Sequence, residues 1–444
     1  MKLLKCLSAV HELCVGSQPV RTLRSPLVNV PLVDRGEDCL GTSDCDRRQR
    51  YPVGILRPAE LESLKADELF VSKSSTSRRA RCSSIGLHPN RSNSATDRIL
   101  AQVKNHLNCD ETVFCLFNPG ISNLPMNLFE AGARRMVLLE AEEDYLVKWK
   151  RFAGQHPDRV WAHHFNFGRL AEQTAQQLIR KQRFPLTPFF EQCGIQGNVE
   201  WKERGACSSA VTHPPIIFIG VLPPFNERST FLCLLANRIT RQNAFEFGPS
   251  EALLFVSSSK YVVLKEDQTA LPKLTRYRRQ EYRLYFDFDL VDKKPLQSFH
   301  PEIAVPKKPK YQRYVEHGKL DPNLLYLVHM KPKRTLPLDP AAIGHATVDH
   351  ALAGLSFLHR QLLASPKATK LGSFLANLMP GIDQHLQHQG FDFSMKLESL
   401  TMRDIVALHS SILSWPDYPD SGFKLEVDAW LEMMWFSPTS TKPT

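Results

Sequence analysis

The sequence predicts an α/β fold in which a mostly parallel sheet domain is followed by a small all-α C-terminal domain. Short apolar runs alternate with helical patterns from residue 112 to 264, and helical periodicity alone continues beyond residue 340. The length of 444 residues also exceeds that of a typical single domain, which is about 100–200 residues. Two folded domains with flanking tails are therefore expected.

The sheet is expected from five short apolar runs with the length and composition of buried strands. They lie at residues 112–117, 135–140, 159–163, 216–222 and 252–257. Residues 228–240 have the apolar spacing of a helix between the last two strands, and residues 184–215 predict a long loop. Two later runs, 282–290 and 324–330, are rich in aromatic and branched residues and are expected to close the sheet.

The all-α domain is expected from three apolar faces with helical spacing. They are formed by Val348, Leu352, Leu355 and Leu362, by Ile405, Leu408 and Ile412, and by Val427, Trp430, Leu431 and Met434. Thr401 and Asp404 have the spacing of a capping box at the start of the second of these helices.

Composition limits the classes of partner. The formal charge of +10 favours an anionic partner, with nucleic acid ahead of a membrane surface. The apolar runs are much shorter than the roughly 20 residues that a membrane-spanning helix needs, so no membrane is expected. The ten cysteines show no C-x-x-C pair, which argues against a zinc ribbon or a redox motif and favours a reducing compartment.

The N-terminal region carries two basic segments. Residues 1–33 hold Lys2, Lys5, Arg21 and Arg24 against one acid, Glu12, which is typical of a mitochondrial transit peptide. Residues 34–94 are expected to be a linker, and its acid-free stretch from residue 72 is either a basic arm for nucleic acid or a tether. The further boundaries expected are 95–335 for the sheet domain, 336–436 for the helical domain and 437–444 for a tail.

The first strand leads into a turn, Asn118-Pro119-Gly120, and the second strand ends in Glu140. A strand, a glycine turn, a helix and a second strand ending in an acid are typical of nucleoside binding, because the acid accepts hydrogen bonds from ribose hydroxyls. The turn has only one glycine, and Pro119 removes a backbone donor. An α/β unit without a ligand therefore stays open at this point.

A second candidate lies at the end of the fourth strand, at Val221, Leu222, Pro223 and Phe225. In open α/β sheets, ligands bind outside the carboxyl ends of the strands. Chemistry on an adenine amino group needs a hydrogen-bond acceptor and an aromatic ring for stacking. Phe225 could stack on a base, but the other three side chains offer no acceptor.

Seven short motifs in order resemble those of the rRNA adenine dimethyltransferase family, over roughly residue 94 to the last helix. They are Thr96-Asp97-Arg98, Asn118-Pro119-Gly120, Glu130-Ala131-Gly132, Glu140, Gly220-x-x-Pro223, Phe245-Glu246-Phe247-Gly248 and Tyr326-Leu327-Val328-His329-Met330. The chain is most similar to the mitochondrial members. The resemblance implies a Rossmann-like S-adenosylmethionine-dependent methyltransferase sheet domain followed by a small all-α domain.

The resemblance also implies site residues. The cofactor positions correspond to Ala95, Asn118, Gly120, Glu140 and, displaced by one place from the usual aspartate, Asn166. Active members carry Asn-Leu-Pro-Tyr or a close variant where this chain has Val221-Leu222-Pro223-Pro224, so the catalytic amide is lost. Such a loss costs ~2–4 kcal/mol of transition-state stabilisation. Binding of S-adenosylmethionine and methyl transfer are therefore expected to be weak or absent.

Basic segments flank the two closing strands and combine cations with tyrosines. The expected nucleic-acid-binding residues are Arg276, Arg278, Arg279, Lys307, Lys308, Lys310 and Arg313. A solvated basic rim is the alternative.

No metal site is expected from the sequence. The adjacent residues His163 and His164 face opposite ways on a strand, and Asp287 and Asp289 have Arg283 as an available partner.

Three functions remain open. The first is a transcription initiation factor that assists the single-subunit mitochondrial RNA polymerase in opening promoter DNA, located in the mitochondrial matrix at the nucleoid. The alternative is S-adenosylmethionine-dependent N6-dimethylation of adenines in mitochondrial small-subunit rRNA. The third is an RNA-binding assembly factor that uses the fold only as a scaffold.

Overall fold

The computed structural model describes residues 85–170, 185–195, 213–222, 227–264, 282–301, 303, 321–333, 347–366 and 368–435. The predicted transit peptide, the greater part of the predicted linker and the predicted tail lie outside these residues. So do Pro223, Phe225 and all seven basic residues expected to bind nucleic acid. The domain boundaries stay predictions.

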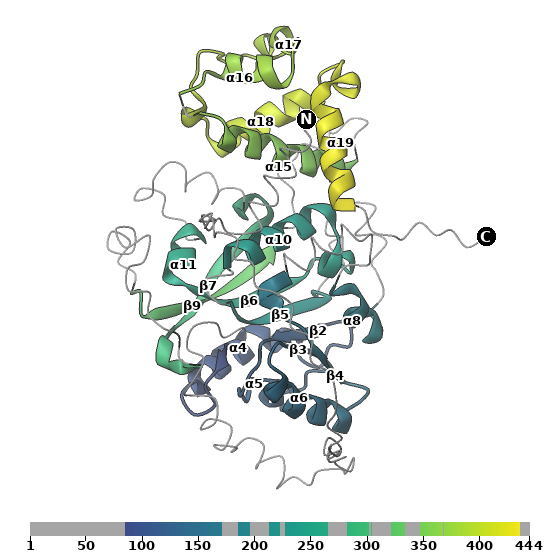
Figure 1. Cartoon of the computed structure of the whole chain (residues 1–444), viewed down its shortest axis with the longest axis vertical. Helices are drawn as coiled ribbons and strands as arrows, with labels where there is room; N and C mark the ends of the chain where they lie inside the picture. The colour runs from purple at the N-terminus through teal and green to yellow at the C-terminus, as the bar shows by residue number, and fades with distance from the viewer. Residues whose placement is uncertain are drawn as a thin grey trace, which may run out of the picture. The chain divides into compact units, whose positions relative to one another are not determined.

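A seven-stranded sheet has the strand order β4-β3-β2-β5-β6-β9-β7 (Figure 1). The first five strands in this order are parallel, and β9 runs antiparallel to both of its neighbours. The strands are β2 Val113–Phe117, β3 Arg135–Glu140, β4 Val160–His164, β5 Ile216–Val221, β6 Glu251–Ser257, β7 Phe286–Pro295 and β9 Leu324–Pro332. The predicted α/β class is confirmed.

The chain leaves the central strand β2 toward β3 and β4 and then returns to pair β5 with the other side of β2. Such a reversal of strand order creates a crevice at the carboxyl ends of the strands, where open α/β folds bind ligands. Phe117, the last residue of β2, pairs with Leu139 of β3 and Gly220 of β5. The residues that follow these three strands therefore lie at one edge of the sheet.

Helices cover both faces of the sheet, so the central strands are buried on both sides and read as continuous apolar runs (Figure 1). One face packs against α4 Asn93–Val103, α5 Leu124–Glu130 and α6 Glu143–Gln155. The other packs against α8 Thr187–Gln192 and α10 Glu227–Thr240, and α11 Ser258–Leu264 follows β6. A small two-stranded sheet joins β1 Gly86–Leu87 to β8 Phe299–His300.

The C-terminal region is helical, as predicted. Its helices are α15 Val348–Ala364, α16 Leu371–Leu378, α17 Asp383–His388, α18 Met402–Leu413 and α19 Gly422–Trp435. Both hydrogen bonds of the predicted capping box, between Thr401 and Asp404, are present at the start of α18. Helix α10 contacts α15 and α19, and one buried apolar cluster continues from the sheet through α10 into these helices.

Two predicted elements differ from the structure. Residues 282–285 form a helical turn, and β7 begins only at Phe286, which pairs with Pro332 at the end of β9. The predicted loop 184–215 contains the short helix α8, whose Phe190 is fully buried. No helix among the described residues is long and apolar enough to span a membrane.

Candidate functional site

The turn after β2 has an unusual backbone. Asn118 and Gly120 both have left-handed conformations, with φ of 50° and 55°. Asparagine and glycine are the residues that tolerate this region best, which explains why these two types flank Pro119. The Asn118 N–H donates to the Leu139 carbonyl, and the Trp149 indole N–H donates to the Gly120 carbonyl. The turn is therefore fixed by β3 and α6.

Glu140 is buried completely at the end of β3, with 0% of its surface exposed. Its Oε2 accepts a hydrogen bond of 2.8 Å from the Gly120 N–H, and its Oε1 accepts one of 3.0 Å from the Glu142 N–H. The carboxylate therefore binds the backbone of the two turns beside it. A ribose hydroxyl could reach it only if this cover moved.

The buried side chain of Asn118, unlike that of Glu140, has no hydrogen-bond partner. Its side chain is 1% exposed, yet neither Oδ1 nor Nδ2 has a hydrogen-bond partner. Most buried amides are satisfied, and an orphaned one indicates a bound water or ligand, or stored strain. Asn118 lines a cavity of about 20 Å³, which is room for about one water molecule.

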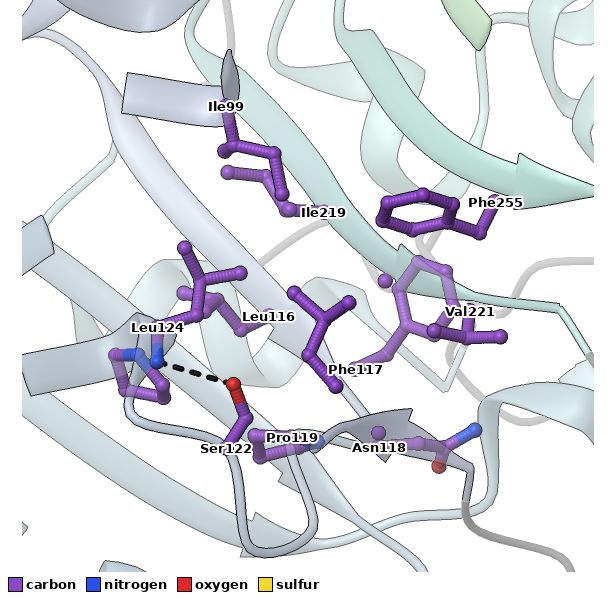
Figure 2. Close-up of a pocket in the computed structure, with 14 residues that line it drawn as sticks. Ile99, Leu116, Phe117, Asn118, Pro119, Ser122, Leu124, Ile219, Val221 and Phe255 are labelled. Carbon is purple, nitrogen blue, oxygen red and sulfur yellow. Dashed lines mark hydrogen bonds between the residues drawn. The ribbon is translucent and has the colours of Figure 1, made fainter. Parts of the chain in front are cut away.

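The rest of this cavity is mostly apolar (Figure 2). Leu116, Leu124, Ile219, Val221 and Phe255 are among the side chains that line it. Figure 2 shows the Asn118 amide at the margin of this group, beyond Pro119. The cavity is therefore a small gap beside the turn.

Strand β1 lies directly against the turn. A Cβ atom on Gly86 would be 2.5 Å from the Pro119 carbonyl oxygen, so only glycine fits at this close approach. Ala95, at the start of α4, is fully buried. Of the expected cofactor residues, Ala95 is thus part of the core.

The end of β5 is apolar and closed. Val221 is 2% exposed and pairs with Phe255 of β6, and the Leu222 N–H donates to the Phe255 carbonyl. Both side chains pack in the core, so they present no acceptor to a base. The loss of a catalytic amide at this position stays a prediction.

Asn166 follows β4 near the same edge. The neighbouring Phe165 N–H donates to the Glu140 carbonyl, which places this segment beside β3. The Asn166 Oδ1 is buried without a partner. The next ring, Phe167, stacks on Phe117 with centroids 4.0 Å apart and an interplanar angle of 11°. The structure thus brings Asn118, Glu140 and Asn166 to one edge of the sheet.

Two of the residues expected to bind S-adenosylmethionine, Ala95 and Glu140, are completely buried in this arrangement. The acid that would bind the ribose is covered and hydrogen-bonded to the backbone, and the polar position at the end of β5 is filled by apolar packing. The side-chain amides of Asn118 and Asn166, at the same edge of the sheet, have buried atoms without a hydrogen-bond partner. Hydrogen-bonding groups are therefore still present at this edge of the sheet, but they are buried in this arrangement.

A buried network at the end of β6 was missed by the sequence prediction. The Ser257 N–H and hydroxyl both donate to Glu227, and burial raises the pKa of Glu227 to about 7. Lys260 lies 4.0 Å from the centre of the Phe231 ring and 4.3 Å from that of Tyr282. The sequence signal was weak, because Glu227 and Ser257 are 30 residues apart.

The expected partner of the β7 carboxylates was wrong. Asp289 pairs with Lys331 at 3.1 Å and Asp287 with Lys333 at 3.7 Å, since these lysines lie on the adjacent strand or directly after it. Arg283 instead donates to the Leu264 carbonyl.

The two adjacent histidines of β4 contact different groups. His163 stacks on Phe189 of α8, whereas His164 contacts the Ala141 carbonyl.

No protein-family model matches the chain. Among solved structures, it resembles the 23S rRNA methyltransferase ErmE with a TM-score of 0.41, 12% identity and coverage of 73% of this chain and 98% of that one. It also resembles a dimethyladenosine transferase from Plasmodium falciparum, with a TM-score of 0.39, 11% identity and coverage of 74% and 97%.

In sequence, the chain is 25% identical over 244 residues to the mouse protein named dimethyladenosine transferase 2, mitochondrial. The match covers 54% of this chain and spans 57% of the length of that relative. The chain is therefore an α/β protein with a helical C-terminal region, weakly similar in sequence to a mitochondrial dimethyladenosine transferase.

Proposed function

We propose that this chain is a mitochondrial transcription initiation factor that assists the single-subunit mitochondrial RNA polymerase in melting promoter DNA, on a methyltransferase-like fold that no longer transfers methyl groups efficiently. The observation that carries the proposal is the end of β5. There, buried Val221 and Leu222 stand where active members of the resembled family hold the target adenine with an amide. A kept fold with a lost catalytic group leaves binding as the retained property.

The energetic argument has two parts. Losing one preorganised hydrogen bond to the reacting group costs about 2.7–4 kcal/mol, or about 10²–10³ in rate. The buried carboxylate of Glu140 adds a second obstacle, because the groups that cover it would have to move before a ribose hydroxyl could reach it. Both effects act against catalysis, and neither affects binding of nucleic acid elsewhere on the chain.

The mitochondrial location and the polymerase partner rest on sequence. The N-terminal 33 residues have the composition of a transit peptide, and the mouse relative is named as a mitochondrial protein. Within the resembled family, the motifs are most like those of mitochondrial transcription factor B2, also called mitochondrial dimethyladenosine transferase 2. We propose that this chain is its counterpart.

The distribution of charge favours the sheet domain and its linkers as the nucleic-acid-binding part. Residues 347–435 contain six lysines and arginines against ten acids, whereas the whole chain has a formal charge of +10. The positive charge therefore resides outside the helical C-terminal region. Because phosphate contacts dominate the affinity for nucleic acid, the basic linkers are the proposed contact region.

The test is promoter-dependent transcription on a linear template with the cognate polymerase. A triple variant with glutamate at Arg276, Arg278 and Arg279 is expected to lose initiation and binding to single-stranded DNA. A matched control makes the same change in charge at three exposed residues of the helical region, Lys370, Lys396 and Arg403, and is expected to retain both. Equal initiation with and without the wild-type chain would refute the proposal.

The second candidate function is S-adenosylmethionine-dependent dimethylation of adenines in mitochondrial small-subunit rRNA. It is favoured by one observation, the unpartnered Asn118 amide next to the convergence of Gly120, Glu140 and Asn166. Calorimetry with the cofactor and methyl transfer onto a hairpin RNA test it. Turnover that disappears in Asn118→Ala, a change that breaks no hydrogen bond, would reverse the ranking.

A further inference from the structure

We propose that His106 and His213 form a two-histidine site for a borderline divalent metal ion such as Zn²⁺ or Ni²⁺. The two Nδ1 atoms lie 3.2 Å apart, and the ring planes are nearly perpendicular at 88°. The site lies at the amino-terminal edge of the sheet, because His213 precedes β5 and His106 precedes β2. It is therefore separate from the candidate site at the carboxyl ends of the strands.

The separation of the two nitrogens matches metal coordination. Zinc–imidazole bonds of about 2.0–2.1 Å place two ligand nitrogens of a tetrahedral site about 3.3 Å apart. In the structure, the same separation is bridged by a direct hydrogen bond between the two Nδ1 atoms. In that hydrogen bond one Nδ1 carries a proton, and metal binding to both Nδ1 atoms requires that this ring adopt the tautomer with its proton on Nε2.

The backbone around both rings is fixed without a metal. Next to His213, the Thr112 hydroxyl donates to the Pro214 carbonyl at 2.9 Å and the Val113 N–H donates to the Pro215 carbonyl at 2.9 Å. Next to His106, which ends the short helix Lys104–His106, the Asn108 N–H donates to the Gly132 carbonyl. The two ligands are therefore preorganised, so binding loses little conformational entropy.

Charged groups of both signs lie near the two histidines. The nearby Glu251 carboxylate favours added positive charge at His106. Glu251 also pairs with His329 Nε2 at 2.7 Å, and the other ring nitrogen of His329 contacts Gln102. Lys331 and His329 are the neighbouring groups that disfavour added positive charge.

The site supplies two protein ligands. Among the described residues, no group of three or more histidines, cysteines or acids is placed to hold a metal ion. Water would occupy the other coordination positions, and the order of divalent metal affinities predicts tighter binding of Ni²⁺ than of Co²⁺ or Mn²⁺. The two histidines are 107 residues apart and belong to no motif, so the sequence predicts no metal here.

The experiment uses the full-length chain, treated with a chelator, dialysed and kept reduced. Calorimetric titration with NiCl₂ and ZnCl₂ is expected to show one equivalent of binding that is lost in His106→Gln and in His213→Gln. Glutamine keeps a polar group at each position, so a merely structural pair would be preserved. His388→Gln, at an exposed histidine of α17, is the matched control and is expected to bind as the wild type does.

Melting temperatures give a second readout. Ni²⁺ is expected to raise the melting temperature of the wild type and of His388→Gln, and to leave the two site variants unchanged. Absence of binding by the wild type, or equal binding by His106→Gln and His213→Gln, would overturn the proposal. Loss of binding in Cys109→Ser but not in His213→Gln would assign the ion to the free thiol of Cys109 and overturn it as well.

Discussion

Replacement of Glu140 by alanine tests whether this residue holds the turns rather than a ligand. The carboxylate is fully buried and accepts hydrogen bonds from the Gly120 and Glu142 N–H groups. A hydrogen bond to a charged group contributes about 1.5–3 kcal/mol, so Glu140→Ala is expected to lower the free energy of unfolding by about 3–6 kcal/mol. Entry of a water molecule into the space left by the side chain would bring the loss toward the lower value.

The assay is urea unfolding followed by circular dichroism, with the midpoint and the slope fitted for each variant. Glu143→Ala is the matched control, because this exposed acid in the first turn of α6 interacts mainly with the helix dipole and contributes less than about 1 kcal/mol. Glu140→Gln keeps one acceptor oxygen and is expected to fall between the two. If Glu140→Ala loses no more stability than Glu143→Ala, the carboxylate does not hold the turns and our interpretation of the covered site is wrong.

Three further predictions concern other parts of the chain. Burial holds the pKa of His409 at about 3, below its unfolded value of 6.5, so the free energy of unfolding is highest above pH 6.5 and falls by up to about 1.4 kcal/mol per pH unit toward pH 3. His409→Leu should reduce this slope when unfolding is measured from pH 7 to 4, and an unchanged slope would contradict the prediction. Gly220→Ala places a Cβ atom 2.6 Å from the Phe117 carbonyl oxygen and should lower the free energy of unfolding in urea by about 1–3 kcal/mol. Gly154→Ala, where the added Cβ meets no atom within 4 Å, should raise it, and equal effects of the two changes would refute the steric argument. Thr401→Ala removes the cap of α18 and should cost about 1 kcal/mol in thermal unfolding, while retention of full stability would show that the cap contributes nothing.

The sheet was predictable because its central strands are buried on both faces. Residues 135–140 coincide with β3, and the capping box at Thr401 fixed the start of α18. The prediction failed at residues 282–285, where a composition typical of strands forms a helical turn, and the described part of β9 ends opposite Phe286. Local propensity cannot show where a partner strand ends, and this is a tertiary property.

The candidate site was predictable as a set of positions and less so as a chemical arrangement. Strand order explains why Asn118, Glu140 and Val221 meet at one edge of the sheet, and the motifs alone indicated these residues. That Glu140 is covered and binds the Gly120 N–H depends on a left-handed turn, which the sequence suggests only weakly. The pairing of His106 with His213 depends entirely on long-range packing.

The side chains of helix α10 that the structure describes have little room to vary. Every described side chain of this helix is buried, because the sheet covers part of it and α15 and α19 contact another part. A substitution there must satisfy two packing partners at once, whereas α6 has one exposed face on which substitutions are cheap. Among homologues, these described positions of α10 should therefore change slowly and together with the residues of α15 and α19 that contact the helix.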